Sequence, residues 1–478
     1  MQMDDMIRTV PGLAAILDAS VRAGQIFPLH ISFPLWKEQY ACAFFEENHM
    51  ICENVKNLAG RLQFAGHDVG ALARQYGTPA YFLDEQRIRK NCRMYKHAMN
   101  AGFEKALPLY ASKALCCRRV LEIVAEEGLG IDVVSAGELY MARLAGVRMD
   151  RTFFHGCSKS DAEIYYGVEN GVGYFIVDGE DELLALARIA GEKGVRQKVL
   201  LRLTPGIDPH TFEAVATGQL DSKFGVPIET GQAEAFLCLA LSLPDIEVCG
   251  YHAHVGSQVF ESSVFRDTAD AMLAFVCLMR DKLGFMPGIL NLGGGYGVRY
   301  VESDPHVDIA WEISKVAGYI RRCCAQLGMP VPAILMEPGR SIVADAGLTA
   351  YTVEAVKRIP GSRDYLCVDG GMADNPRYAL YGAAYTVLAP EHMDAPRDFI
   401  CTIGGHCCES GDMIQENVPM PRLSRGDLVA VLTTGAYNHS MASNYNNVPR
   451  PPVVMLDGAR TYIAVRRETY GDMASREQ

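Results

Sequence analysis

A lysine at the end of a short apolar segment is the first residue in this sequence whose placement suggests chemistry. Residues 108–114 read PLYASKA, and the small residues around Lys113 deliver its amine at the end of a predicted buried strand. An amine in apolar surroundings loses hydration, which lowers its pKa and makes the neutral nucleophile available. We therefore predict that Lys113 forms a Schiff base with a carbonyl compound; an ordinary surface lysine is the alternative.

Three consecutive glycines, Gly293, Gly294 and Gly295, suggest a site for an anion. Where no side chain intervenes, backbone N–H groups approach a ligand closely and can point at its negative charge. Ser257 adds a hydroxyl and Arg340 a cation at the ends of neighbouring predicted strands. The combination favours a phosphate site over the tight turn that a glycine triplet alone indicates.

Glu337 and His254 have a predicted task beside such a site. A carboxylate near a Schiff-base lysine and a phosphate can keep a pyridine nitrogen protonated, so that the ring accepts electrons from a carbanion. His254 is placed to lie against an aromatic ring. The alternatives are a salt bridge between Glu337 and Arg340 and a histidine that belongs to the core.

A zinc interpretation draws on His252, His254, His406, Cys407 and Cys408. Histidines at i and i+2 on a strand point to one face but do not fix a tetrahedral geometry. This interpretation also leaves the lysine, the glycines and the glutamate without a role. We therefore predict no metal.

Eight β-branched or apolar runs carry these residues, and most of them end at or beside Gly, Ser, Asp or Pro. They span residues 107–111, 130–135, 152–156, 174–178, 198–205, 248–256, 289–295 and 333–340. Helix starts follow several runs: Ser135 with Glu138 and Ser160 with Glu163 are predicted capping boxes, and Asp178 is a predicted cap. Eight strand–helix units predict an α/β fold, a (β/α)8 TIM barrel with its active groups at the C-terminal strand ends.

The pattern changes after about residue 345, where helical periodicity becomes scarce and strand-like runs predominate. These runs span residues 350–359, 365–368, 399–403, 428–432, 453–456 and 461–466. They predict a separate C-terminal β domain. We therefore expect an N-terminal extension of unknown role at 1–60, with a possible amphipathic helix at 6–23, then a strand at 61–80 that joins the β domain, the barrel at 81–345 and the β domain at 346–478.

Composition narrows the classes of protein. The 478 residues are 49% hydrophobic and 21% charged, as in globular proteins, and the net charge of −12 argues against nucleic acid or an anionic membrane as partner. The 15 cysteines are scattered and odd in number, which is not a disulfide framework. The N-terminus has no signal-peptide pattern, and the longest apolar run, near residues 236–243, is too short to span a bilayer. We expect a cytoplasmic protein.

Together these residues identify a family. From about residue 77 to 472, the chain resembles the fold type III pyridoxal-phosphate decarboxylases, most closely those that act on diaminopimelate. The matching stretches are YASKA at 110–114, GIDVVSAGE at 130–138, DPHT at 208–211, DSKFG at 221–225, HVGSQ at 254–258, GGG at 293–295, EPGRS at 337–341, CESGD at 408–412 and SNYN at 443–446.

The resemblance implies a role for each matching residue with pyridoxal 5′-phosphate as cofactor. Lys113 is implied as the Schiff-base lysine, His254 as the side chain stacked on the ring, and Glu337 as the partner of the pyridine nitrogen. The implied phosphate cradle consists of Ser257, Gly293, Gly294, Gly295, Gly339, Arg340 and Tyr437.

The resemblance also implies a head-to-tail homodimer with shared active sites. Cys408 is implied as the catalytic proton donor and reaches into the site of the other subunit. The implied substrate-binding residues are Arg340, Arg377, Tyr381, Glu409 and Tyr437. Arginines suit carboxylates because the planar guanidinium donates two parallel hydrogen bonds. The implied reaction is decarboxylation of meso-2,6-diaminopimelate to L-lysine and carbon dioxide, as part of lysine biosynthesis.

Two alternatives are kept open. His406 and Cys407 replace the expected Pro-Ile pair, and Gly382 stands where Asp is usual, which motivates a decarboxylase of D-ornithine, D-lysine or a related diamino intermediate. The second alternative is a non-catalytic pyridoxal-phosphate-binding protein. A racemase is disfavoured because the resemblance would then require an arginine in place of Glu337.

Overall fold

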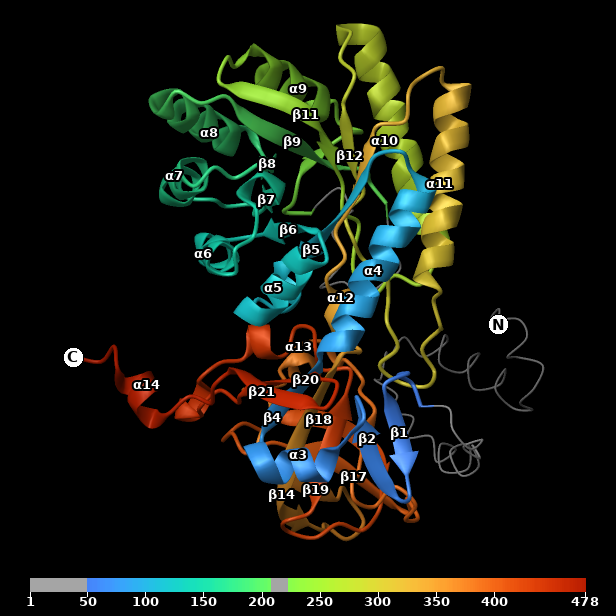
Figure 1. Ribbon diagram of the computed structural model, residues 1–478, viewed down its shortest axis with the longest axis vertical. Helices are drawn as coiled ribbons and strands as arrows, with labels where there is room; N and C mark the ends of the chain where they lie inside the picture. The colour runs from blue at the N-terminus through green and yellow to red at the C-terminus, as the bar shows by residue number, and fades with distance from the viewer. Residues whose placement is uncertain (1–49, 208–221) are drawn as a thin grey trace, which may run out of the picture. The chain divides into compact units, whose positions relative to one another are not determined.

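The computed structural model describes residues 50–207 and 222–478, and its elements carry the labels of Figure 1. The predicted helix at 6–23 and the DPHT motif at 208–211 lie outside the described residues. Within the two described ranges, every helix is too short or too polar to span a bilayer. Each cysteine described there is a free thiol.

Eight parallel strands close into a barrel, which confirms the predicted fold. The strands are β5 (Ala106–Ala111), β6 (Gly130–Val133), β7 (Thr152–Phe154), β8 (Tyr174–Val177), β9 (Gln197–Thr204), β11 (Ile246–His252), β12 (Ile289–Asn291) and β13 (Ala333–Met336). Each pairs with the next, β13 pairs with β5, and β8 pairs with β9. The two-residue β10 (Val226–Pro227) adds to β9.

Helices follow the strands and cover the barrel (Figure 1). They are α4 (Glu85–Gly102), α5 (Arg118–Glu126), α6 (Ala136–Leu144), α7 (Asp161–Glu169), α8 (Glu180–Lys193), α9 (Gln232–Ser242), α10 (Ser262–Leu283), α11 (Ile309–Gln326) and the short α12 (Arg340–Val343). Branched and aromatic side chains fill the barrel interior, among them Leu109, Phe153, Ile176, Leu200 and Leu335, all nearly inaccessible.

Of the three predicted helix caps, one forms in full, one forms in part and one does not form. Ser160 forms the full capping box with Glu163. Ser135 caps α6, but the Glu138 carboxylate does not complete the box, because it accepts hydrogen bonds from Val134 N and Ser112 Oγ, each at 2.8 Å. The prediction for Asp178 is wrong: Gly179 occupies the cap position.

The second sheet is built mainly from the C-terminal part of the chain. Its strands are β14 (Gly347–Lys357), β15 (Tyr365–Val368), β16 (Val387–Leu388), β17 (Phe399–Gly404), β18 (Met413–Met420), β19 (Leu428–Leu432), β20 (Val453–Asp457) and β21 (Arg460–Val465). One strand from before the barrel, β4 (Ala80–Asp84), lies between β14 and β20, antiparallel to the first and parallel to the second. A single strand thus ties the start of the barrel to this sheet.

Smaller elements complete the described chain. They are the three-stranded sheet of β1 (Val55–Leu58), β2 (Arg61–Phe64) and β3 (His67–Asp68), the helices α3 (Val69–Tyr76), α13 (Arg377–Tyr381) and α14 (Tyr470–Ala474), and short 3-10 turns at Ser112–Ala114, Met149–Arg151, His439–Met441 and Tyr445–Asn447. Two of these elements, the turn at Ser112–Ala114 and α13, carry predicted site residues. The domain limits drawn from the sequence stay predictions.

Candidate active site

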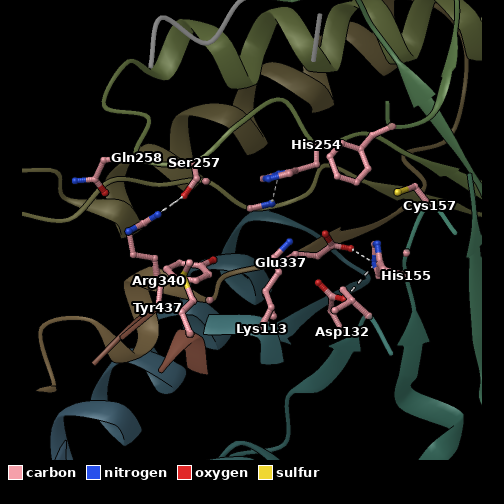
Figure 2. A pocket seen from close by; sticks show the side chains of 18 of the residues that line it. Lys113, Asp132, His155, Cys157, His254, Ser257, Gln258, Glu337, Arg340 and Tyr437 are labelled. Atoms are coloured by element: carbon pink, nitrogen blue, oxygen red, sulfur yellow. Dashed lines mark hydrogen bonds and ion pairs between the residues drawn. The ribbon is translucent and has the colours of Figure 1, made fainter. Parts of the chain in front are cut away.

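A cavity of about 560 Å³ lies where the C-terminal ends of the barrel strands meet residues of the second sheet region (Figure 2). Most of the predicted site residues line it together: Lys113, His254, Ser257, Gly294, Gly295, Glu337, Gly339, Arg340, Arg377, Tyr381 and Tyr437. Asp132 and His155, which end the neighbouring strands, line it as well. The convergence of these groups is the pattern expected of a barrel enzyme.

Lys113 projects into this cavity from the short turn that follows β5. The turn is fixed by Ser112, whose Oγ lies 2.7 Å from the carbonyl oxygen of Asp132 and 2.8 Å from Glu138 Oε2. Surrounding protein lowers the pKa of Lys113, but attraction to Asp132, Tyr437 and Glu337 outweighs this effect and raises the pKa above its ordinary value. The expectation of a lowered pKa is therefore wrong, because the sequence did not show how many acidic groups surround the amine.

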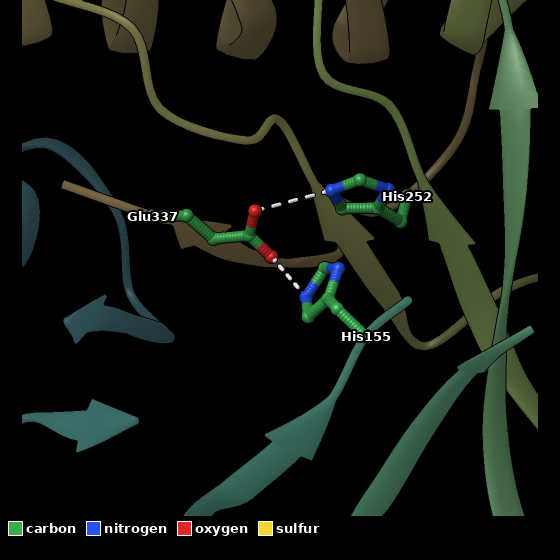
Figure 3. A group of neighbouring side chains, drawn as sticks. All are labelled: His155, His252 and Glu337. Atoms are coloured by element: carbon green, nitrogen blue, oxygen red, sulfur yellow. Dashed lines mark hydrogen bonds and ion pairs between the residues drawn. The ribbon is translucent and has the colours of Figure 1, made fainter. Parts of the chain in front are cut away.

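Glu337 is held by three polar side chains at the end of β13. Its carboxylate lies 2.8 Å from His155 Nε2 and 3.2 Å from His252 Nε2, and it accepts a 2.6 Å hydrogen bond from Asn291 Nδ2 (Figure 3). Burial favours protonation of Glu337, but the two histidines outweigh it and hold the pKa of the carboxyl well below its usual range. The alternative pairing of Glu337 with Arg340 is not formed; Arg340 bonds Ser257 and Tyr300 instead.

Glu337 and its two histidine neighbours also have the composition of a metal site. The ligand atoms of His155, His252 and Glu337 lie within 4.8 Å of one another. Both carboxylate oxygens, however, already face histidine Nε2 atoms at hydrogen-bonding distance. Carboxylate–histidine bonding explains this cluster without a metal ion. It differs from the zinc set considered from sequence, in which His406 is exposed.

Asp132 is the most unusual carboxylate of the cavity. Its side chain is 1% exposed, and neither oxygen has a hydrogen-bond partner among the described residues. Burial raises the pKa of Asp132 to about 6; His155, whose Nε2 lies 3.7 Å away, opposes the rise and Glu337 adds to it. A buried carboxylate without hydrogen-bond partners, in the same cavity as a lysine, fits a cavity that receives a polar ligand.

The glycine triplet lies where the backbone packs closely against other backbone segments. A Cβ on Gly294 would stand 2.0 Å from the carbonyl oxygen of Glu337, and one on Gly295 would stand 2.2 Å from that of Gly256. Two of the three amides are used inside the protein: Gly293 N donates to Asn291 Oδ1 (3.0 Å) and Gly294 N to His254 Nδ1 (3.3 Å). These two amides therefore orient side chains rather than point at an anion.

His254 is oriented by that amide, and its ring borders the cavity near Lys113 (Figure 2). Burial, reinforced by the positive charge of Lys113, lowers the pKa of His254 well below its ordinary value. The ring is therefore neutral at physiological pH. A neutral ring is suited to stacking on a flat aromatic ligand.

The anion end of the cavity is formed by Arg340 and Ser257. Arg340 Nη2 and Nε donate to Ser257 Oγ at 2.9 and 3.2 Å, and the guanidinium lies 4.7 Å from the Tyr437 ring centroid. A lysine amine, a neutral histidine ring, an ionised carboxylate and this cationic end together match the parts of pyridoxal 5′-phosphate. The donor set of the cavity therefore fits this cofactor.

Arg377 occupies a second cationic position. It is 5% exposed, donates from Nη1 to Tyr385 Oη (2.7 Å), and its guanidinium lies 4.6 Å from the Tyr300 ring centroid. Tyr381 is four residues away in α13, so one short helix supplies both residues to the cavity.

Three predicted residues do not line the cavity of this chain: Gly293, which lies directly before two glycines that do, and Cys408 and Glu409. The last two are exposed. Cys408 N donates to Asn446 Oδ1 (2.8 Å), and Tyr445 Oη donates to Glu409 Oε2 (3.2 Å). The GGG and EPGR motifs meet at the cavity of one chain, whereas no residue of the CESGD motif lines that cavity.

Three contributors were missed by the sequence analysis: Asn291, Tyr300 and Tyr385. Asn291 ends β12 two residues before the glycine triplet, so its place at a strand end was a usable signal. Tyr300 and Tyr385 contact Arg340 and Arg377 but do not line the cavity. No pattern in the sequence indicated these contacts.

Comparison with known proteins agrees with this geometry. The family described as "Pyridoxal-dependent decarboxylase, pyridoxal binding domain" matches residues 85–344. The diaminopimelate decarboxylases of Halalkalibacterium halodurans and Bacillus subtilis are 42% and 41% identical to the chain, and each alignment covers 87% of this chain and 95% of the relative.

Solved structures give the same result. The diaminopimelate decarboxylase of M. jannaschii in complex with L-lysine aligns with a TM-score of 0.83 and 30% identity, over 90% of this chain and 99% of that one. The Helicobacter pylori diaminopimelate decarboxylase complexed with L-lysine aligns with a TM-score of 0.78 and 29% identity, over 86% and 99% of the two chains.

Proposed function

The chain belongs to the pyridoxal-dependent decarboxylases, and on that premise we propose that it converts meso-2,6-diaminopimelate to L-lysine and carbon dioxide. The observation that carries the substrate is Arg377, a buried guanidinium that lines the cavity. A substrate with a second, distal carboxylate gives this charge a partner. D-Lysine and D-ornithine have none, so each would leave a buried cation unpaired, which is costly.

Bound pyridoxal phosphate supplies an electron-accepting ring that stabilises the negative charge left when carbon dioxide departs. Lys113 would hold the cofactor through Nζ. Glu337 holds a proton at the ring nitrogen, because His155 and His252 keep its own carboxylate ionised. His254 would cover one face of the ring, and Arg340 with Ser257 would bind the phosphate, with Gly295, Gly339 and Tyr437 lining the cavity beside them. Gly293 and Gly294 would shape the turn, because their amides are used inside the protein.

The substrate would be oriented by cationic and phenolic residues that line the cavity. Arg377 and Tyr381, with Arg340 and Tyr437, bind the distal part of the substrate. Fixing that end would orient the reacting carboxylate for the loss of carbon dioxide. Loss of carbon dioxide from the D centre of meso-diaminopimelate would give L-lysine as product.

We further propose that two chains form a head-to-tail dimer with shared active sites. Cys408 would give the proton that replaces carbon dioxide, and Glu409 would bind the distal ammonium group. Both are exposed on this chain and lie outside its cavity, so they are free to enter the cavity of a second copy.

We propose a cytoplasmic location for the enzyme. Free thiols at all described cysteines are suited to a reducing compartment. The substrate is a charged small molecule that requires no membrane or nucleic-acid partner.

The direct test is carbon dioxide release from meso-diaminopimelate, D-lysine and D-ornithine by the cofactor-loaded protein, with identification of the product. We expect strong preference for diaminopimelate and L-lysine as product. Preference for either D-monocarboxylic substrate would overturn the role given to Arg377 and the proposed substrate. Silence on all three despite bound cofactor would favour a non-catalytic protein.

A further inference from the structure

Tyr300 stands between the two arginines of the cavity. It is 4% exposed, and its Oη accepts a 2.8 Å hydrogen bond from Arg340 Nη1. The face of the same ring lies 4.6 Å from the guanidinium carbon of Arg377. One side chain therefore contacts both the arginine assigned to the phosphate and the arginine assigned to the distal carboxylate.

The position of Tyr300 is fixed from several directions. Its N–H donates to Asp304 Oδ2 (2.8 Å), and its carbonyl oxygen accepts from Thr386 N (3.0 Å) and Thr386 Oγ1 (2.9 Å). Its ring meets Tyr385 edge-on at 5.4 Å. The residue thus connects the loop after β12 to the second sheet region.

A phenol suits this place better than a carboxylate. Within the described part of the chain, neither Arg340 nor Arg377 forms an ion pair with an acidic side chain. An acidic neighbour would neutralise a charge that is needed for an incoming anion, whereas a phenol orients a guanidinium and leaves its charge available. The two guanidinium groups act on the phenol in return: burial raises its pKa, but Arg340 and Arg377 outweigh burial and lower it.

We propose that Tyr300 is a positioning residue that joins Arg340 and Arg377 into one clamp and so fixes the spacing between the cofactor phosphate and the distal carboxylate of the substrate. The first part of this proposal, that Tyr300 positions Arg340 for the phosphate (the phosphate half), requires only the cofactor. The second part, that Tyr300 sets the spacing to the distal carboxylate (the spacing half), rests on the proposed function, because only a dicarboxylate substrate engages Arg377. The clamp would select substrates by length as well as by charge.

Tyr385 provides a matched comparison. Its Oη accepts from Arg377 Nη1 (2.7 Å) and donates to Asn438 Oδ1 (3.1 Å), so it contacts one arginine of the clamp. Tyr251 provides a control, because it is fully buried and its hydroxyl has no hydrogen-bond partner among the described residues. The variants Tyr300→Phe, Tyr385→Phe and Tyr251→Phe each remove one hydroxyl and keep the ring.

The first experiment titrates the cofactor-free full-length variants with pyridoxal phosphate and, in parallel, with pyridoxal. Loss of a hydrogen bond that orients a charged group should weaken pyridoxal-phosphate binding by Tyr300→Phe at least about tenfold. Pyridoxal binding should not change, because it has no phosphate. Tyr385→Phe and Tyr251→Phe should bind both compounds as the wild type does. Equal pyridoxal-phosphate affinity in Tyr300→Phe and wild type would overturn the proposal.

The second experiment measures KM and kcat with meso-diaminopimelate. At saturating cofactor, Tyr300→Phe and Tyr385→Phe should both raise KM, by about tenfold, with a smaller change in kcat. Tyr300→Leu, which also removes the ring face, should raise KM further. Thermal denaturation of each variant separates loss of the fold from loss of positioning. An unchanged KM in Tyr300→Phe would overturn the spacing half of the clamp.

The two experiments also separate this inference from the proposed function. A wild type that is inert toward diaminopimelate, with the tenfold cofactor effect present in Tyr300→Phe, would overturn the proposed substrate and leave the phosphate half supported. A wild type active on diaminopimelate, with Tyr300→Phe unaltered in both experiments, would overturn the clamp alone.

Discussion

At the scale of single residues, the cavity is organised around an ionised carboxylate in a buried position. Glu337 is 7% exposed, and an isolated carboxylate at such a site would take up a proton. Two histidines and Asn291 supply the hydrogen bonds that prevent this. An ionised carboxylate has about four lone-pair positions, and we propose that one of those left open serves the ring nitrogen.

Replacing Glu337 with Gln should separate catalysis from cofactor binding. The amide is neutral and cannot hold a proton at the ring nitrogen, so we expect kcat to fall at least about 100-fold. Bound pyridoxal phosphate per chain should remain close to that of the wild type. Both quantities are measured by carbon dioxide release and by cofactor absorbance.

A matched control is Glu85→Gln. Glu85 is 2% exposed and paired with Arg89 and Arg119, but it does not line the cavity. This variant should lose stability and keep its kcat. A kcat for Glu337→Gln within threefold of the Glu85→Gln value, roughly the spread of such measurements, would contradict the role of the carboxylate.

Gly294→Ala should abolish tight cofactor binding. The added methyl group would stand 2.0 Å from the carbonyl oxygen of Glu337, so the backbone on both sides must move. Gly318→Ala in α11 is the control, because its added methyl group meets only the end of the Arg322 side chain, at 3.5 Å. We expect the control to be stabilised by about 0.5–1 kcal/mol, since alanine favours helix. Equal pyridoxal-phosphate affinity in the two variants would be inconsistent with the close approach.

Residues at strand ends were the ones that the sequence could predict. Lys113, Ser257, Glu337 and Arg340 follow apolar runs, and a barrel brings such ends to one face. Tyr300 could not be predicted in this way, because its role depends on side chains that meet only in space. The pKa of Lys113 was predicted in the wrong direction for the same reason: a strand-end position does not reveal the charges of its neighbours.

At the scale of elements, two loops of the second sheet region are joined by buried carboxylates. Asp412, in the loop that carries Cys408, accepts 2.6 Å hydrogen bonds from Cys407 N and Met372 N. Asp374 fixes the next turn by accepting hydrogen bonds from Gly371 N (2.8 Å) and Tyr351 Oη (2.5 Å). The loop that leads to Arg377 and the loop that carries Cys408 are therefore held together.

Asp374, one of these two carboxylates, makes the free energy of unfolding depend on pH. Burial raises the pKa of Asp374 to about 7 from 3.8, although Tyr351 opposes the rise. Between these two values the folded state retains a proton that the unfolded state releases, so this residue lowers stability as pH rises from about 4 to about 7. Asp374→Asn should remove that dependence, which is at most about 4 kcal/mol.

Denaturant unfolding of wild type and variant at pH 4.5, 6 and 7.5 measures the effect. The difference in unfolding free energy should move in favour of the variant as pH rises. Asp394→Asn, at an exposed position, controls for the added amide. Parallel curves for wild type and Asp374→Asn would contradict a raised pKa.

At the scale of the whole molecule, one chain holds most of a catalytic site. The barrel, α13 and residues such as Tyr437 supply the cavity, while the exposed Cys408 does not line it. The sequence motifs predicted the barrel because its strands and helices alternate with a regular period. The separation of Cys408 from the cavity of its own chain could be expected only from the family resemblance, since an assembly leaves no periodic pattern in sequence.

Mixing two inactive variants tests the proposed assembly. Lys113→Ala removes one half of a site and Cys408→Ala the other half, so each variant alone should be nearly inactive. If the sites are shared, subunit exchange produces mixed dimers with one intact site, and roughly a quarter of wild-type activity should return. Activity that stays at the level of the separate variants after exchange would place both residues in the site of a single chain.

The position of β4 has a consequence for how the protein is made. This strand precedes the barrel, yet one of its two neighbours, β20, begins at Val453. On the ribosome, the barrel strands through Met336 emerge well before β20 does. The backbone hydrogen-bonding groups on that edge of β4 therefore stay unpaired until synthesis is nearly complete. The last strands of the chain therefore complete the pairing of β4. A messenger truncated before them would yield a barrel preceded by a strand with one unpaired edge.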